Sequence, residues 1–133
     1  MAIKVLDSWA LMAYFMDQSG AEQVERLLLK AARDRHPLLL SVINWGEIYY
    51  SVMRADSQKA AEQVASEIAG LPIELVPVNE NLEMVRQAAV FKANKKMSYA
   101  DCFAAALAKI KNAELVTGDP EFKVVERDRK SVV

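Results

Sequence analysis

The chain has 133 residues, of which 53% are hydrophobic and 26% are charged, and its formal net charge is −1. This length fits one domain with a hydrophobic core of its own, and the composition excludes a disordered chain. Because the net charge is close to zero, no global field attracts nucleic acid, and any such binding must come from local patches of charge.

The cysteine content and the lack of long apolar runs indicate where the protein works. Cys102 is the single cysteine. It cannot form an internal disulfide or a cysteine metal cluster, which favours a reducing compartment. No apolar run approaches the roughly 20 residues that span a bilayer, and the N-terminus lacks signal-peptide architecture. We therefore expect a cytoplasmic protein with no membrane partner.

Short apolar strands alternate with helices in the first half of the chain. Asp7 and Ser8 stand where the first strand ends and the first helix begins. Asn44 is predicted to cap the third helix, with Glu47 closing a capping box. The elements expected here are a strand over 3–6, helices over 9–16 and 21–35, a strand over 38–42, a helix from residue 44 and a helix over 57–69.

The second half continues the alternation and contains the most apolar helix of the chain. Ser98 can cap that helix, and Asp101 lies in its first turn. The elements expected here are a strand over 73–76, a helix over 79–94 capped by Asn79, the apolar helix over 97–108, a strand at 115–116, an edge strand over 123–125 and a charged tail over 126–133.

This pattern predicts the fold class. Short, uniformly apolar strands separated by helices are typical of a parallel sheet that is covered on both faces. We therefore predict a single α/β domain over residues 1–133, with a mainly parallel sheet of four or five strands between helices. In such folds ligands bind outside the carboxyl ends of the strands.

Four acidic residues map to that edge of the predicted sheet. Asp7 follows the first strand, Glu47 lies early in the helix after the second, and Asp119 follows the fourth, while Asp101 reaches the edge from its helix start. Each alone has a simpler explanation, as a helix cap or, for Asp119, as a turn residue. Four carboxylates in one pocket repel each other, however, and a hard divalent cation such as Mg²⁺ or Mn²⁺ resolves the repulsion.

Four stretches, in order along the chain, carry a family resemblance. They are Val-Leu-Asp-Ser-Trp-Ala-Leu at 5–11, Ser-Val-Ile-Asn-Trp-Gly-Glu-Ile-Tyr-Tyr at 41–50, Ser-Tyr-Ala-Asp-Cys-Phe-Ala-Ala-Ala-Leu-Ala at 98–108 and Leu-Val-Thr-Gly-Asp-Pro-Glu-Phe at 115–122. With them the chain resembles PIN-domain nucleases nearly end to end, and most closely the VapC-type toxins of VapBC toxin–antitoxin systems.

The resemblance implies a PIN-like three-layer fold and metal-dependent cleavage of RNA. It also implies that Asp7, Glu47, Asp101 and Asp119 are the catalytic, metal-binding acids. The last motif varies most in the family, so Glu121 is the alternative fourth ligand if the turn is built differently.

Two hydroxyl side chains next to the acids have candidate roles. Ser8 and Thr117 could donate hydrogen bonds that orient Asp7 and Asp119. A helix cap and a turn hydroxyl are equally good explanations of the same residues.

Charged and apolar surfaces point to partners. Arg54, Lys95 and Lys96 could hold RNA phosphates, although a solvated helix face is the commoner origin of such charges. The apolar run over 12–16 is a partner surface or extra core, and the aromatic segment over 45–50 could stack bases, join the core or form a dimer face. Since similar proteins form homodimers that bind an antitoxin, we expect both partners.

Two other function classes are disfavoured. A phosphoryl-accepting receiver-like domain needs a pair of acids after its first strand and a lysine near its last, and a nucleotide-binding enzyme needs a Gly-rich loop; the chain has neither. We interpret the chain as a metal-dependent endoribonuclease and the toxin of a toxin–antitoxin pair. The alternatives are a PIN nuclease of RNA processing and a non-catalytic PIN module that binds RNA or protein.

Overall fold

The computed structural model of the chain describes residues 2–117 and 130–132. Its strands form one sheet in the order β3-β2-β1-β4-β5, and each pair of neighbouring strands is parallel. The strands are β1 (Lys4–Leu6), β2 (Leu38–Ser41), β3 (Ile73–Val76), β4 (Glu114–Thr117) and β5 (Lys130–Val132). The predicted parallel sheet is thus confirmed.

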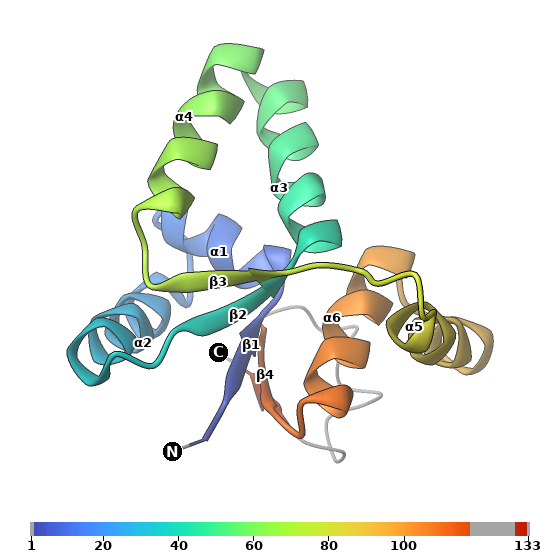
Figure 1. Ribbon diagram of the computed structural model, residues 1–133. Coiled ribbons are helices and arrows are strands. Elements are labelled where there is room, and N and C mark those ends of the chain that lie inside the picture. The colour runs from blue at the N-terminus through green and yellow to red at the C-terminus, as the bar shows by residue number, and fades with distance from the viewer. Residues whose placement is uncertain (1, 118–129, 133) are drawn as a thin grey trace.

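Helices cover both faces of the sheet, as Figure 1 shows. The described helices are α1 (Ser8–Phe15), α2 (Ala21–Asp34), α3 (Val42–Ala55), α4 (Gln58–Ala69), α5 (Glu83–Asn94) and α6 (Tyr99–Ile110). One hydrophobic cluster joins the sheet to α1, α2, α3 and α4, and a second joins it to α5 and α6. The predicted three-layer α/β architecture is therefore confirmed.

The strands divide their side chains between these two clusters. Val5, Leu39 and Leu115 pack toward α5 and α6. Leu6 packs toward the helices of the other face, as do its register partners in β2 and β4. Because successive side chains of a strand point to opposite faces, this alternation is what a sheet buried on both sides requires.

The apolar helix predicted over 97–108 is α6, and it is buried. All residues from Asp101 to Ala108 are buried, four of them alanines. Small side chains let a helix approach its neighbours closely, and α6 packs between the sheet and α5. Within residues 2–117 and 130–132, no helix combines the length and the apolar character that crossing a bilayer requires.

Two predicted helix caps are wrong. Ser41, not Asn44, caps α3, because β2 runs directly into the helix and the Ser41 hydroxyl accepts a hydrogen bond from the Ile43 amide at 3.2 Å. Helix α5 starts only at Glu83, whose amide donates to Asn81 Oδ1 at 3.1 Å. The helix predicted to start at Asn79 therefore begins four residues later.

The C-terminal predictions have a mixed outcome. The strand predicted over 123–125 lies outside the described residues. Residues 130–132, which we placed in a charged tail, form β5 instead and pair with β4 in parallel. The physical reason is that β4 needs a partner on its second side, since an open edge leaves a row of backbone groups without hydrogen bonds.

The core positions predict a sharp contrast between two leucines. Leu40 of β2 is fully buried, whereas Leu29 of α2 is 64% exposed. We expect Leu40→Ala to lower the free energy of unfolding by about 2–5 kcal/mol, because it leaves a cavity in the hydrophobic cluster between the sheet and helices α1 to α4. Leu29→Ala should change it by less than about 0.5 kcal/mol. Urea denaturation followed by circular dichroism measures both, and equal losses would contradict this description of the core.

Candidate active site

The strand order reverses direction at β1. From β1 the chain builds β2 and β3 to one side, and later β4 and β5 to the other. Ligands of open α/β sheets bind at such a reversal, outside the carboxyl ends of the strands. Asp7 follows β1 at this point, Thr117 ends β4, and the Asp7 amide donates to the Val116 carbonyl at 3.4 Å.

Buried polarity is concentrated at this edge. Six polar or charged side chains are buried among the described residues, and each lies at the carboxyl end of β1, β2 or β4, or at the start of α1, α3 or α6. They are Asp7, Ser8, Ser41, Asn44, Asp101 and Thr117. Burial of polar groups has a cost, so their collection at one edge marks it as the candidate site.

Asp7 is fully buried and caps α1. Its Oδ1 accepts a hydrogen bond from the Ala10 amide at 2.8 Å, and the partial positive charge of the helix N-terminus stabilises the carboxylate. The capping explanation of Asp7 is therefore correct. It does not exclude a ligand role, because an ionised carboxylate has about four acceptor sites and the cap occupies one.

Glu47 lies in the second turn of α3 and is half-buried. The Ser8 hydroxyl donates a hydrogen bond to Glu47 Oε1, which ties the start of α1 to α3. The predicted capping box between Asn44 and Glu47 is wrong, because the helix starts earlier than the sequence indicated. Ser8 thus orients Glu47, a carboxylate to which we had not assigned it.

Asp101 lies in the first turn of α6 and is 5% exposed. Its amide donates to the Ser98 hydroxyl at 3.1 Å, so the predicted cap by Ser98 is confirmed. The Asn44 side chain then joins this turn to α3, since its Nδ2 donates to the Ala100 carbonyl at 3.1 Å. Two hydrogen bonds, Ser8 to Glu47 and Asn44 to Ala100, therefore link the three helices that carry Asp7, Glu47 and Asp101.

The fourth predicted acid, Asp119, and its alternative Glu121 lie outside the described residues. Within the described part of the chain, no three His, Cys, Asp or Glu side chains gather closely enough to hold a metal ion by themselves. The structure thus brings three acid-bearing helix starts to one edge, and the ligand set remains a proposal.

The donor chemistry at this edge fits a hard divalent cation. Asn44 is fully buried, and its Oδ1 has no hydrogen-bond partner among the described residues. Since Nδ2 must face the Ala100 carbonyl, the orientation of the amide is fixed. Amide and carboxylate oxygens are the ligands that Mg²⁺ and Mn²⁺ prefer. The sequence alone does not identify Asn44 as a site residue, because a cap is the simpler explanation of an asparagine near a helix start.

The basic candidates lie on or directly before two helices that also carry acids of the site. Lys95 and Lys96 lie between α5 and α6, directly before the turn that carries Asp101, and Lys92 donates to the Met97 carbonyl at 2.7 Å, which holds that connection. Arg54 lies in the last turn of α3, and its guanidinium lies 5.1 Å from the centroid of the Tyr50 ring.

Comparison with known proteins gives a family and a set of folds. The sequence profile of the PIN domain matches residues 4–128. No curated protein matches the chain.

Three solved structures have the same fold as this chain. They are VapBC2 from Rickettsia felis bound to a promoter DNA fragment (16% identity, TM-score 0.71, 98% of each chain), DNA-bound VapBC from Salmonella typhimurium (16%, 0.71, 99% of this chain and 98% of that chain) and the sarcin–ricin loop cleaving toxin VapC20 from Mycobacterium tuberculosis (17%, 0.69, 92% and 94%). At these identities the similarity establishes the fold alone.

Binding of a divalent cation should stabilise the folded chain. We expect Mg²⁺ or Mn²⁺ to raise the melting temperature, since a ligand held only by the folded state at 100 times its Kd adds about 2.7 kcal/mol. Asp7→Asn should lose most of this shift while keeping an oxygen that caps α1. Differential scanning fluorimetry measures the shift.

The matched control is Glu83→Gln, which removes an exposed carboxylate from the first turn of α5 and should leave the shift unchanged. A folded parent protein without any shift at millimolar metal would argue against the site.

Proposed function

The chain belongs to the PIN-domain family, and we propose that it is a divalent-metal-dependent endoribonuclease that hydrolyses RNA phosphodiester bonds. The observation that carries this proposal is the placement of Asp7, Glu47 and Asp101 around the reversal of strand order, with three helix starts linked there by hydrogen bonds. We propose Asp119, or Glu121 in its place, as the fourth acid.

The acids have distinct environments that suit distinct tasks. Asp7 and Asp101 are buried at helix N-termini, where the helix dipole attracts negative charge, and we assign them as the fixed ligands of a Mg²⁺ or Mn²⁺ ion. When bound, such an ion supplies positive charge for the phosphate and acidifies a water molecule. Asn44 Oδ1 adds a neutral oxygen of the kind that such an ion prefers, at the same edge of the sheet.

Glu47 is the acid best placed to move a proton. It is half-buried, and Ser8 holds its Oε1, so the side chain is oriented while Oε2 can accept the proton of the attacking water. In this hydrolysis the water oxygen bonds to phosphorus, the bond to the leaving oxygen breaks, and that oxygen takes a proton from solvent. Ser8 is a positioning residue in this scheme, and Thr117, at the end of β4, would act on Asp119.

The basic side chains supply the charge that attracts RNA to an acidic edge. Lys95 and Lys96, directly before α6, and Arg54, on α3, can contact phosphates that flank the cleaved bond. Because these contacts are electrostatic, we expect binding to weaken as salt increases.

We further propose that the protein is the toxin of a toxin–antitoxin pair and forms a homodimer. Support comes from the folds it shares with VapBC complexes and with the toxin VapC20. Of the apolar run over 12–16, Met16 is 46% exposed, whereas the other residues are buried or half-buried, so this run contributes more to the core than to a surface. Trp9, 52% exposed on α1, and Met16 are the exposed apolar side chains near this run that a partner helix could cover.

Asp101→Asn separates catalysis from folding. We expect RNA cleavage to fall by about 100-fold or more, because the charge that stabilises the reacting centre is lost. The metal-free melting temperature should stay equal or rise, since repulsion among carboxylates is relieved. Gel assays on structured and unstructured RNA with Mn²⁺ measure cleavage, with Glu83→Gln as the fully active control. Normal cleavage by Asp101→Asn would exclude a catalytic role for this residue.

The toxin role has its own test. Expression of the parent chain without its neighbouring gene should slow bacterial growth, whereas Asp7→Asn at the same soluble level should not. Co-expression of the adjacent gene product should restore growth and yield a complex. Equal growth with the parent and the variant would remove the toxin role, and would favour a PIN nuclease of RNA processing if RNA cleavage in vitro persists.

A further inference from the structure

One stripe of α3 leads outward from the candidate acid Glu47. Residues spaced three or four positions apart share a helix face, and Ile43, Glu47, Tyr50 and Arg54 follow this spacing. Glu47 is half-buried, whereas Tyr50 is 48% exposed and Arg54 is also exposed. At 1.5 Å per residue, Tyr50 lies about 5 Å and Arg54 about 10 Å beyond Glu47 along the helix axis.

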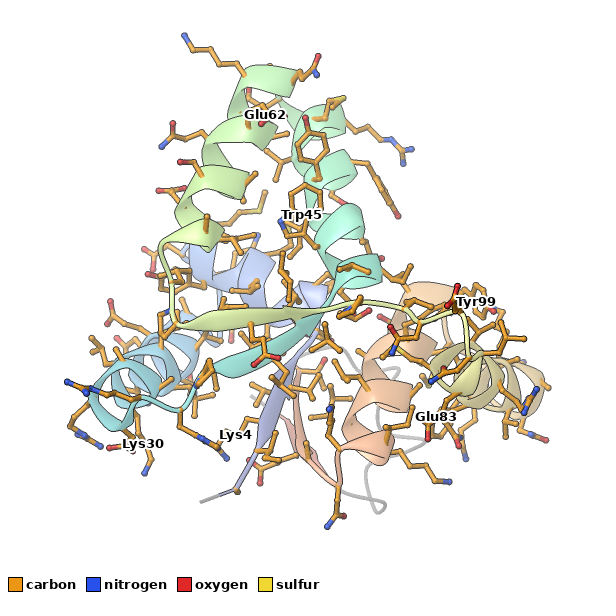
Figure 2. The ribbon with its side chains drawn as sticks, in the orientation of Figure 1. Lys4, Lys30, Trp45, Glu62, Glu83 and Tyr99 are labelled. Carbon is orange, nitrogen blue, oxygen red and sulfur yellow. The ribbon has the colours of Figure 1, made fainter. Side chains whose placement is uncertain are left out.

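The opposite side of α3 is occupied by contacts within the protein. Trp45 and Tyr49 stack with their ring centroids 5.3 Å apart, and the Tyr49 hydroxyl donates a hydrogen bond to Glu62 of α4. This bond raises the pKa of Tyr49, which keeps the hydroxyl a donor. Figure 2 shows Trp45 and Glu62 between the two helices. Tyr50 is therefore the aromatic residue of α3 that faces solvent.

Tyr50 and Arg54 combine an aromatic ring with a positive charge. The guanidinium lies 5.1 Å from the ring centroid, within the range of a cation–π interaction. Within the described part of the chain Arg54 forms no ion pair, so its charge can act on a ligand. Arg is planar, and both its guanidinium and an aromatic ring stack on nucleobases.

We propose that Tyr50 and Arg54 bind an unpaired RNA nucleotide beside the phosphodiester that the acids cleave. The base stacks on Tyr50, and Arg54 contacts the adjoining phosphate. This inference rests on the proposed nuclease function. Bases in a duplex are stacked on each other and cannot also stack on a side chain, so this pair selects single-stranded or loop RNA. The positive charge at the end of the stripe matches an anionic polymer that continues past the acids.

Binding to a cleavage-deficient protein tests the proposal without relying on catalysis. In the Asp101→Asn background, a short, unstructured, dye-labelled RNA is titrated with protein in Mg²⁺, and fluorescence anisotropy gives the Kd. We expect Tyr50→Ala to raise the Kd by about 5- to 150-fold, the usual effect of losing one stacked base. Tyr50→Phe should restore the parent Kd, because it keeps the π-face.

Salt dependence separates the charge from the ring. Arg54→Gln should weaken binding and lower the slope of log K against log salt by about 0.7, the value for one single-strand phosphate contact. Arg26→Gln is the same change at an exposed site on α2. It should lower neither the RNA affinity nor the salt slope by a comparable amount. A duplex of the same sequence should bind without any dependence on Tyr50.

Several results would overturn the proposal. The proposal is wrong if Tyr50→Ala binds RNA with unchanged affinity, or if the parent binds no RNA. It is also wrong if the substitution weakens binding of duplex and of single-stranded RNA equally. If Tyr50→Ala still binds RNA but no longer binds the protein encoded by the adjacent gene, this stripe is instead a protein-docking face. Normal binding with Tyr50 dependence, but no cleavage by the parent, would remove the nuclease function and leave this RNA site standing.

Discussion

Two carboxylates are buried at one edge of the sheet, and the arrangement of the helices around them stabilises their negative charge. Each of them, Asp7 and Asp101, lies at the N-terminus of a helix, where backbone N–H groups and the helix dipole favour a negative charge. This follows from topology. In a parallel sheet each helix that follows a strand starts at the carboxyl edge, and α6, which precedes β4, runs back from that edge.

The core fixes the site in place. Helix α6 is buried from Asp101 to Ala108, so the position of its first turn is set by packing rather than by the loop before it. The same holds for Asp7, because the strand before it pairs on both sides and α1 packs on the sheet. Glu47 is different. It is half-buried and oriented by one hydrogen bond from Ser8, which suits a side chain that must exchange protons with water.

The sequence predicted the layers, the parallel sheet and the edge at which Asp7, Glu47 and Asp101 lie, because apolar periodicity and helix-start residues are local signals. It misplaced the start of α3, since Ser41 and Asn44 are both good N-cap residues and only the tertiary fold decides between them. Buried in the first turn, Asn44 bridges α3 to α6 instead. That role, like the Ser8 bond to Glu47, joins residues far apart in sequence, and no single-sequence pattern reports such contacts.

Three parts of helix α3 have different roles. At its start, Asn44 and Glu47 belong to the buried polar edge. Farther along, Trp45 and Tyr49 pack toward α4 and hold the two helices together. The third side carries Tyr50 and Arg54 into solvent. Because one rigid helix carries all three, a ligand on the outer stripe is held at a fixed distance from Glu47. Recognition by Tyr50 and Arg54 would therefore position the substrate for cleavage, since a helix holds a site more closely than a loop does.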